Sequence, residues 1–341
     1  ALRQGPLEAF RLGIEGEMLV DGWSWVSGAE EADSSGLRSE QGPARQAVVT
    51  LRHTRRPVEV RVCTRLDGSD WLVRWLEIAN RGEQALGISA VTPMAGRLWA
   101  HRYDEHLRAG ARSPFEIAYN HHTIWGHEGD LWWEAVRPGV FSFDGGRNGK
   151  SGWSRPAFWA HDKANGQTFV AELAWSGNWE LEIACQLEEN KKEGALYFAL
   201  GMAPVRAAAY EGKPEMLRVL GPGEMARTPA VHIGLFQCNA DEIVQSLHRH
   251  VRHTVMPKAP GGHDIEIEAN HRGYLCDREN EVDLKRDIDV AASIGAEMYV
   301  VDAGWFGREP NQWGRNVGDW RAGPWLPNGL EPVVEHAHAK G

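Results

Sequence analysis

The chain has 341 residues, with 37 Lys and Arg against 47 Asp and Glu, which gives a formal net charge of -10. Hydrophobic residues make up 42% and charged residues 25%, the usual balance of a globular protein. An acidic chain without a basic stripe is a poor candidate for binding nucleic acid, and no run of about 18 apolar residues predicts a membrane span. We therefore expect neither nucleic acid nor a membrane as a partner.

The four cysteines are Cys63, Cys185, Cys238 and Cys276, and no two of them form a Cys-x-x-Cys pair. Their spacing predicts neither a disulfide framework nor a zinc ribbon, and free thiols favour a cytoplasmic location. The start, "ALRQGPLEAF", lacks the pattern of a secretory signal and also lacks an initiator Met. The 16 Trp are more than core packing usually requires, and flat rings in clefts are typical of sugar-binding proteins.

Residues 1–238 have the pattern of an antiparallel β-protein. Alternating or β-branched runs of strand length recur between turns such as "LDGSD" and "KANGQ", with no helical pattern among them. This spacing predicts two sheets packed as a large sandwich. The predicted strands cover 47–53, 58–66, 71–80, 166–176, 179–187, 194–202 and 230–237.

Residues 239–263 form a predicted helix and linker between two domains. Ile243, Leu247 and Val251 recur every four residues, which indicates one amphipathic helix. Asn239 or Asp241 could cap its start, and Pro257 would end it before the linker "KAPGG". The three histidines of this segment, which are His248, His250 and His253, are expected on the solvent side.

Residues 264–341 alternate between strand and helix. The pattern predicts strands over 264–270 and 296–301, each followed by a helix, over 279–295 and 328–341. Two parallel strands leave an open apolar edge, and a complete (β/α)8 barrel needs roughly 250 residues. We therefore expect this segment to be the start of a barrel whose remainder lies beyond residue 341.

Asp302 ends the second of these strands and opens a loop of about 26 residues, against the usual 2 to 6. Ligands of β/α folds bind at the carboxyl ends of the strands, so an acid here is a candidate for the functional site. A helix cap or a partner for a core arginine is the alternative role. The loop also contains several tryptophans, which argues against disorder.

The chain resembles the melibiase-type α-galactosidases of glycoside hydrolase family 36. The segments "YVVDAGWFG", "VGDW" and "LPNGL" follow that family's D-D-G-W-F-G, L-G-D-W and L-P-N-G-L in order and spacing. Upstream, "WLVRWLEIANRGEQALGI", the segment around "SGNW", and "GPGEMARTP" also resemble the family. The resemblance implies an N-terminal β-supersandwich, a (β/α)8 catalytic barrel and a C-terminal β-domain.

The resemblance also implies an activity, the hydrolysis of terminal α-linked galactose with retention, by two carboxylates and without metal or other cofactor. The substrate would be an oligosaccharide or another α-galactoside, and a homo-oligomer is possible. In the family both catalytic aspartates follow on later barrel strands, the nucleophile in a K-W-D motif. We therefore nominate no catalytic residue here and expect residues 1–341 alone to be inactive.

The resemblance assigns substrate-binding roles to three residues of the long loop. Asp302 corresponds to the first of two paired aspartates that bind galactose hydroxyls. Trp320 corresponds to a tryptophan that lines the pocket, and Asp319 lies beside it in the same motif. Trp305 is expected to pack within the loop and not to contact sugar.

Two departures from the family pattern affect the expected pocket. Ala303 stands where the family has its second aspartate, and the first barrel strand ends in "NHRGY", with Arg272 and Tyr274, where N-x-W-E-A is common. Loss of a charged hydrogen bond costs about 1.5–3 kcal/mol, enough to change sugar preference. We expect a divergent pocket around positions 4 and 6 of the sugar, with Arg272 as a further substrate-binding residue.

Two alternative functions remain open from the sequence. One is a non-catalytic carbohydrate-binding protein with a decayed site, and the other is an α-galactosyl transferase like the raffinose synthases. The histidine-rich loop from His121 to Asp130 matches no standard zinc spacing. We expect it to be a polar, aromatic loop, with a metal site as the weaker alternative. The resemblance implies a third interpretation, a loop that reaches the mouth of the barrel and narrows the pocket.

Overall fold

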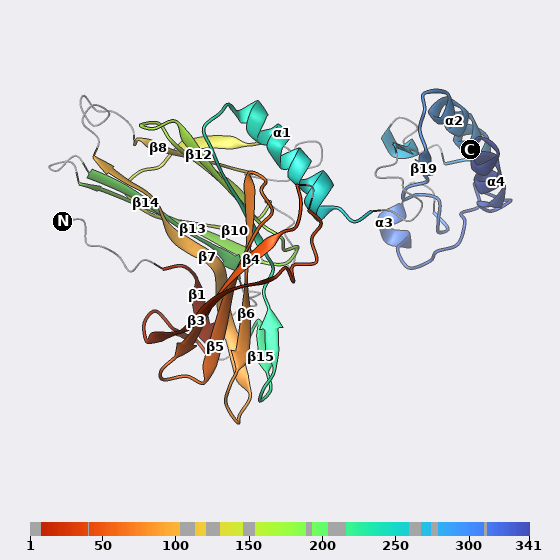
Figure 1. Cartoon of the computed structure of the whole chain (residues 1–341). Helices are drawn as coiled ribbons and strands as arrows, with labels where there is room; N and C mark the ends of the chain where they lie inside the picture. Colours follow the sequence, from red (N-terminus) through yellow and green to blue (C-terminus); the bar gives the residue numbers. More distant parts are fainter. Residues whose placement is uncertain are drawn as a thin grey trace. The chain divides into compact units, whose positions relative to one another are not determined.

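The computed structural model describes residues 8–39, 41–102, 113–120, 130–145, 154–188, 193–203, 216–258, 267–273, 279–309 and 312–341. The chain divides into two compact units, Ala1–Met256 and Pro257–Gly341 (Figure 1). The division falls inside the segment 239–263 that the sequence predicts to be a helix and linker.

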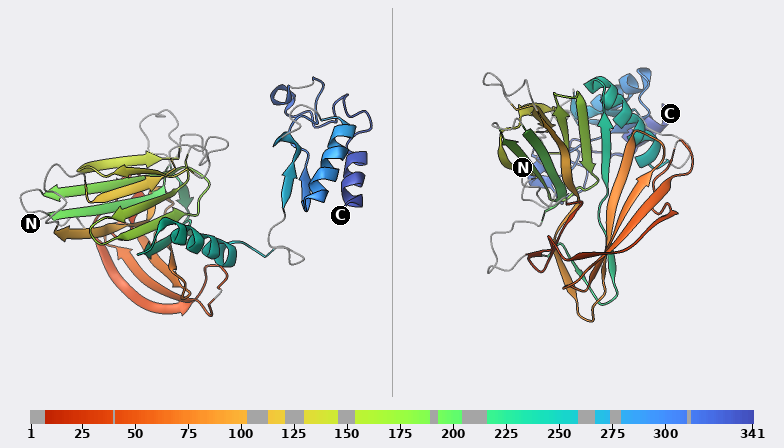
Figure 2. Two further views of the ribbon diagram at one scale, coloured as in Figure 1. Left: turned by 90° about the horizontal axis from the view of Figure 1, so that it is seen from above. Right: turned by 60° about the vertical axis from the view of Figure 1, so that its left-hand side comes forward.

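The first unit is built of antiparallel sheets (Figure 2). One has seven strands in the order β10-β13-β14-β7-β1-β2, with β15 paired to β7. Strand β7 is long enough to pair with β14, β1 and β15 along its length. The strands are β1 (Arg11–Ile14), β2 (Glu17–Met18), β7 (Leu86–Arg102), β10 (Gly139–Asp144), β13 (Trp179–Glu188), β14 (Glu193–Met202) and β15 (Arg218–Leu220).

The second sheet of this unit has ten strands in the order β3-β4-β5-β6-β17-β12-β11-β8-β9, with β16 paired to β6. Strands β3 and β9 therefore form its two edges. The strands are β3 (Trp23–Ala32), β4 (Arg45–His53), β5 (Val58–Leu66), β6 (Trp71–Asn80), β8 (Phe115–Tyr119), β9 (Trp132–Ala135), β11 (Ala157–Asp162), β12 (Gln167–Leu173), β16 (Met225–Arg227) and β17 (Val231–Phe236).

The main core lies between the two sheets. Alternation along each strand turns every second side chain inward, so Phe158 and Phe169 of one sheet pack with Phe198 of the other. Leu181 and Ile183 of β13 are fully buried in the same cluster. The antiparallel sandwich predicted from the strand pattern is confirmed.

Helix α1 (Ala240–His250) packs on the outer face of the ten-stranded sheet and continues into a π-helical turn, Val251–Val255 (Figure 1). Asn239 forms a capping box with Glu242, as predicted for the start of this helix. The buried positions include Ser246, whose hydroxyl accepts a hydrogen bond from the Trp71 indole at 3.1 Å. This face of the helix is therefore partly polar.

His250 is buried, so the prediction that it faces solvent is wrong. Its Nε2 lies 2.8 Å from Nδ1 of His232 on β17, and its ring stacks on Trp71 with centroids 5.1 Å apart. Apolar spacing alone missed this position because a neutral imidazole with a ring partner and a hydrogen bond can be buried. His248 is exposed, as expected.

The second unit contains two parallel strands, β18 (Glu268–Asn270) and β19 (Met298–Val300), as predicted for two βα units of a barrel. Asn280 caps the helix after β18, and Gly295, with φ of 88°, follows its end. The buried core consists of Leu284, Ile288, Leu326 and Val333. The helices are α2 (Glu281–Ser293), α3 (Trp313–Asn316) and α4 (Glu331–Ala339), with a 3-10 turn at His271–Gly273.

The short helix α3 was not predicted, because four residues within a loop show no helical period. None of the helices in the described part of the chain is long and apolar enough to cross a membrane.

Candidate functional site

The candidate site lies where the two parallel strands end. Because β18 and β19 run in the same direction, Asn270 and Asp302 come out at the same edge of the sheet. The Asn270 side-chain amide donates to Oδ2 of Asp302 at 3.1 Å, and the Asp302 backbone N–H donates to Nδ1 of His271 at 3.1 Å. The strand ends are thus joined through polar side chains.

Asp302 is held as a carboxylate. The backbone N–H of Ala303 donates to its Oδ1 at 2.6 Å and is the main cause that lowers the pKa of Asp302 below its usual range. The Asn270 amide lowers this pKa further, against the opposing effect of partial burial. The side chain is half-buried, so this strand end presents an ionised hydrogen-bond acceptor that is partly accessible to solvent.

Arg272 bridges the two strand ends. Its Nη1 donates to the backbone carbonyl of Ala303 at 2.9 Å and to Oε1 of Glu279 at 2.8 Å. Its backbone N–H donates to Oδ1 of Asn270 at 3.0 Å. The structure therefore brings Arg272 and Asp302, two of the predicted site residues, into one hydrogen-bonded network.

Glu279 is the principal residue that sequence reasoning missed. Its side chain is only 4% exposed, and Oε1 lies 3.6 Å from Nε2 of the fully buried His271. Gly304 lies against the Glu279 side chain: a Cβ at this position would be 2.1 Å from the same Oε1, and its φ is 116°. The sequence alone does not show whether an acid is buried, so only Gly304 and Arg272 could have indicated the position of Glu279.

Asp319 and Trp320 lie apart from that network. Asp319 makes long ion pairs of 3.7 Å with Arg308 and 3.9 Å with Arg321, and Trp320 is 60% exposed with its edge against Phe306. Within the described ranges, no hydrogen bond or ring contact joins either residue to Asp302. Their substrate-binding roles remain a prediction.

The long loop is tied back on itself. Phe306 and Ala322 form an antiparallel bridge, supported by the hydrogen bond from Gly307 N–H to the Arg321 carbonyl at 2.9 Å. Trp305 packs against the apolar cluster of this unit, as expected for a supporting residue.

Two sequence predictions fall where no structure is described. Tyr274 lies outside the described residues, and so does the loop from His121 except for its last residue, Asp130. In the described part of the chain, no group of three or more His, Cys, Asp or Glu could hold a metal ion.

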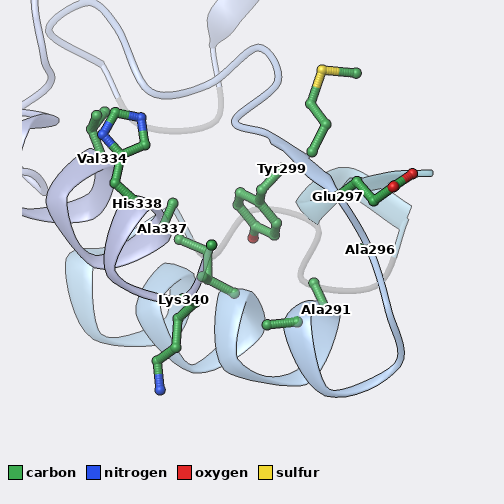
Figure 3. Close-up of a pocket in the computed structure, with 12 residues that line it drawn as sticks. Ala291, Ala296, Glu297, Tyr299, Val334, Ala337, His338 and Lys340 are labelled. Carbon is green, nitrogen blue, oxygen red and sulfur yellow. The ribbon is translucent and has the colours of Figure 1, made fainter. Parts of the chain in front are cut away.

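A pocket of about 290 Å³ lies at the opposite end of β19 (Figure 3). Ala291 of α2, Tyr299 of β19 and Ala337 of α4 contribute to its lining. The Tyr299 hydroxyl donates to Asp287 at 2.5 Å, a contact that ties β19 to α2. Because ligands of β/α folds bind at the carboxyl ends of the strands, we assign the candidate site to the Asp302 end and not to this pocket.

Comparison with known proteins finds a family model that matches part of the chain and several curated relatives. Residues 226–341 match the Melibiase family model. Alpha-galactosidase Mel36A of Lactobacillus acidophilus is 24% identical over 275 residues, which are 79% of this chain and 34% of that protein. An alpha-galactosidase of Escherichia coli is 26% identical over 182 residues, 52% of this chain and 23% of its own. The chain thus spans about a third or less of these curated relatives.

Solved structures share the fold. The family 36 alpha-galactosidase AgaA of Geobacillus stearothermophilus, at 19% identity, gives a TM-score of 0.72 over 98% of this chain and 44% of its own. A variant of AgaA in complex with stachyose gives 0.74 over the same shares. Residues 226–341 thus match the melibiase family, and the chain as a whole is similar in sequence to curated α-galactosidases and in fold to the solved α-galactosidases of glycoside hydrolase family 36.

Proposed function

We propose that this chain contributes one wall of the sugar pocket of a retaining glycoside hydrolase that acts on terminal α-linked galactose-type sugars of oligosaccharides. One observation carries the proposal: an ionised Asp302 stands at the carboxyl end of β19, supported by Asn270 and by the Ala303 N–H. A carboxylate held in this way can accept hydrogen bonds from two sugar hydroxyls without ordering its own side chain first.

The catalytic carboxylates are proposed to lie downstream of residue 341. A retaining mechanism requires a nucleophile and an acid/base about 5 to 5.5 Å apart, with a covalent glycosyl-enzyme intermediate and no cofactor. Asp302 accepts hydroxyl hydrogens, Arg272 shapes the strand end beside it, and Trp320 with Asp319 forms the outer wall. On this proposal residues 1–341 bind sugar but do not hydrolyse it.

The proposal is tested by assaying the longer protein on a panel of aryl α-glycosides while NMR follows the anomer released. We expect α-galactosides to react fastest and the first product to retain its configuration. Asp302→Asn should lower kcat/KM by about 10- to 150-fold, the loss of a charged hydrogen bond worth roughly 1.5–3 kcal/mol. The matched control is Asp289→Asn, an exposed acid of α2 that pairs with His336 and Lys340. Release of the inverted anomer would contradict the mechanism.

Sugar preference is proposed to depend on Ala303. Its backbone carbonyl accepts from Arg272, but its methyl side chain offers no acceptor where the family has a second aspartate. Ala303→Asp in the longer protein should change the ratio of rates on α-galactosides and competing α-glycosides by tenfold or more, since about 1.4 kcal/mol corresponds to tenfold. Unchanged ratios would show that position 303 does not set the preference.

The absence of a carboxyl group at Ala303 also supports a second candidate, a non-catalytic carbohydrate-binding protein. Saturable sugar binding without turnover on any glycoside of the panel would favour it. Transfer of galactose to an added sugar acceptor would instead favour the transferase alternative.

A cytoplasmic location is also proposed, and the free, buried thiols of Cys63 and Cys185 support it. A homo-oligomer formed through the sandwich is also proposed, and sedimentation of the purified chain tests it.

A further inference from the structure

The outer face of the ten-stranded sheet carries two neighbouring rows of side chains near its β9 edge. The first row runs across four paired strands and consists of Trp133, Ala118, Trp159 and Val170. Two residues along, Glu116, His161 and Thr168 form the second row. Since alternate residues share a face, both rows point away from the core between the sheets.

Helix α1 covers only part of these rows. Trp159 and Val170 are buried beneath it together with Ile243, but Trp133 at the edge strand remains 45% exposed. Between the first turn of α1 and Trp133 the sheet is open. A pocket of about 390 Å³ lies there, which we call the outer-face pocket, lined by Glu116, Trp133, Trp159, His161, Thr168 and the start of α1. Small-molecule sites have volumes of about 300–1,000 Å³.

Trp133 stands as a wall of the outer-face pocket. Its ring is nearly perpendicular to those of Trp159 and His161, at 84° and 89°, with centroids 6.3 and 6.4 Å away. These edge contacts fix the ring at the rim, while a large part of its surface stays accessible. A fixed, accessible aromatic ring suits the apolar C–H face of a pyranose, since it buries apolar area at little entropic cost.

The polar groups of the pocket favour a neutral ligand. The Glu116 carboxylate is paired with Lys163 at 2.5 Å, so it carries no unbalanced charge that would select a cation. Nδ1 of His161 lies 2.9 Å from the Thr168 hydroxyl, which fixes both side chains beside the acid. Together they offer hydrogen-bonding groups on one side of the pocket and an aromatic ring on another, the combination that a sugar ring requires.

We propose that the outer-face pocket is a second carbohydrate-binding site, which holds one neutral pyranose ring of an oligosaccharide. The ring stacks on Trp133, and its hydroxyls hydrogen-bond to Glu116, His161 and Thr168. The site belongs to the first unit and uses none of the residues of the Asp302 site. It therefore stands or falls independently of the proposed hydrolase function.

Raffinose binding to the 341-residue chain tests this proposal by calorimetry and saturation-transfer NMR, in an Asp302→Asn background that weakens the other site. We expect saturable binding, weakened tenfold or more by Trp133→Ala. Trp133→Phe, which keeps a ring, should retain most of the affinity. The matched control is Trp25→Ala, because Trp25 is 65% exposed on β3, the opposite edge of the same sheet, and its loss should change nothing.

Three outcomes would overturn the proposal. They are no saturable raffinose binding in the Asp302→Asn background, equal losses in Trp133→Ala and Trp25→Ala, and tighter binding of galacturonate than of galactose. Thermal unfolding of each variant accompanies the titrations. If Trp133→Ala does not fold, Glu116→Gln replaces it, with an expected loss of threefold or more, and unchanged affinity in that variant would count against the site.

Discussion

The two units of this chain use charged residues in opposite ways. The first unit holds four of the five apolar clusters of the described residues, and it also buries charged groups that pair internally, such as Arg65 with Asp33 and Asp67. In the second unit a single small cluster supports charged residues gathered at one strand edge, around Asp302. Buried pairs in the first unit therefore serve folding, whereas the network of the second, which includes the half-buried Asp302 and Arg272, can serve a ligand.

The largest expected effect on stability comes from replacing Arg65. Its side chain is 1% exposed, and it donates to Asp33 at 2.9 Å, to Asp67 at 3.0 Å and to the Arg38 carbonyl at 2.7 Å. Arg65→Met leaves these acids without their partner, so we expect the free energy of unfolding to fall by about 3–5 kcal/mol. Urea unfolding measures it. Arg45→Met, which breaks an exposed pair with Glu30, should lower stability far less. Equal losses in the two variants would refute the comparison.

The next effect depends on pH, through the His232–His250 pair. Burial is the main cause that lowers the pKa of His232 to about 3 and that of His250 to about 4, from 6.5. The unfolded chain binds more protons between these values, so stability is complete above about pH 6.5 and falls as the pH decreases toward 3. We expect a loss of roughly 4 kcal/mol between pH 7 and pH 5, since the unfolded chain gains a proton on each of two histidines over about 1.5 pH units and each unit is worth about 1.36 kcal/mol.

Thermal unfolding across this pH range checks the effect. His250→Phe keeps the stacking on Trp71 but removes one titrating ring, so its stability should depend less on pH than that of the parent chain. His248→Phe changes an exposed histidine two residues earlier on the same helix and should leave the pH dependence as it was. A flat profile for the unsubstituted chain would show that the pair does not act in this way.

The smallest effect is expected in the second unit. Glu279→Gln removes the charge that Arg272 and His271 contact, and charged hydrogen bonds contribute about 1.5–3 kcal/mol. Hydrogen exchange should show weaker protection of α2 and β19. On the proposed function, titration with a sugar should also show weaker binding at Asp302. Glu281→Gln, in a solvent-accessible pair with Lys285 on the same helix, should reduce stability much less. Unaltered exchange in Glu279→Gln would mean that the buried carboxylate does not organise the strand ends.

The sequence predicted strands well where alternation was strong. The structure reproduces the predicted ranges 58–66 and 71–80 as β5 and β6, because both strands carry apolar side chains toward a core. Strand β3 was missed, since nine of its ten residues are exposed and no face of it is apolar. It is held by backbone pairing with β4, which leaves no trace in a hydrophobic pattern.

The candidate site was predictable in part for a similar reason. Asp302 was recognised because its place at a strand end is a local property of the sequence. The pairing of Arg272 with Glu279 was not, since it depends on how the chain after β18 returns to the start of α2. His250 shows the same limit in the first unit, where a tertiary partner on β17 decided burial.

The bridge between Phe306 and Ala322 has a consequence for how this site can change over evolution. It brings the two ends of the intervening loop together. The length of that loop can therefore vary at a small entropic cost. Insertions or deletions there would alter the outer residues Asp319 and Trp320 while β19 keeps Asp302 in place. The architecture therefore separates an anchor fixed on a strand from a rim carried on a loop, and on the proposed function the rim can change without rebuilding the strand.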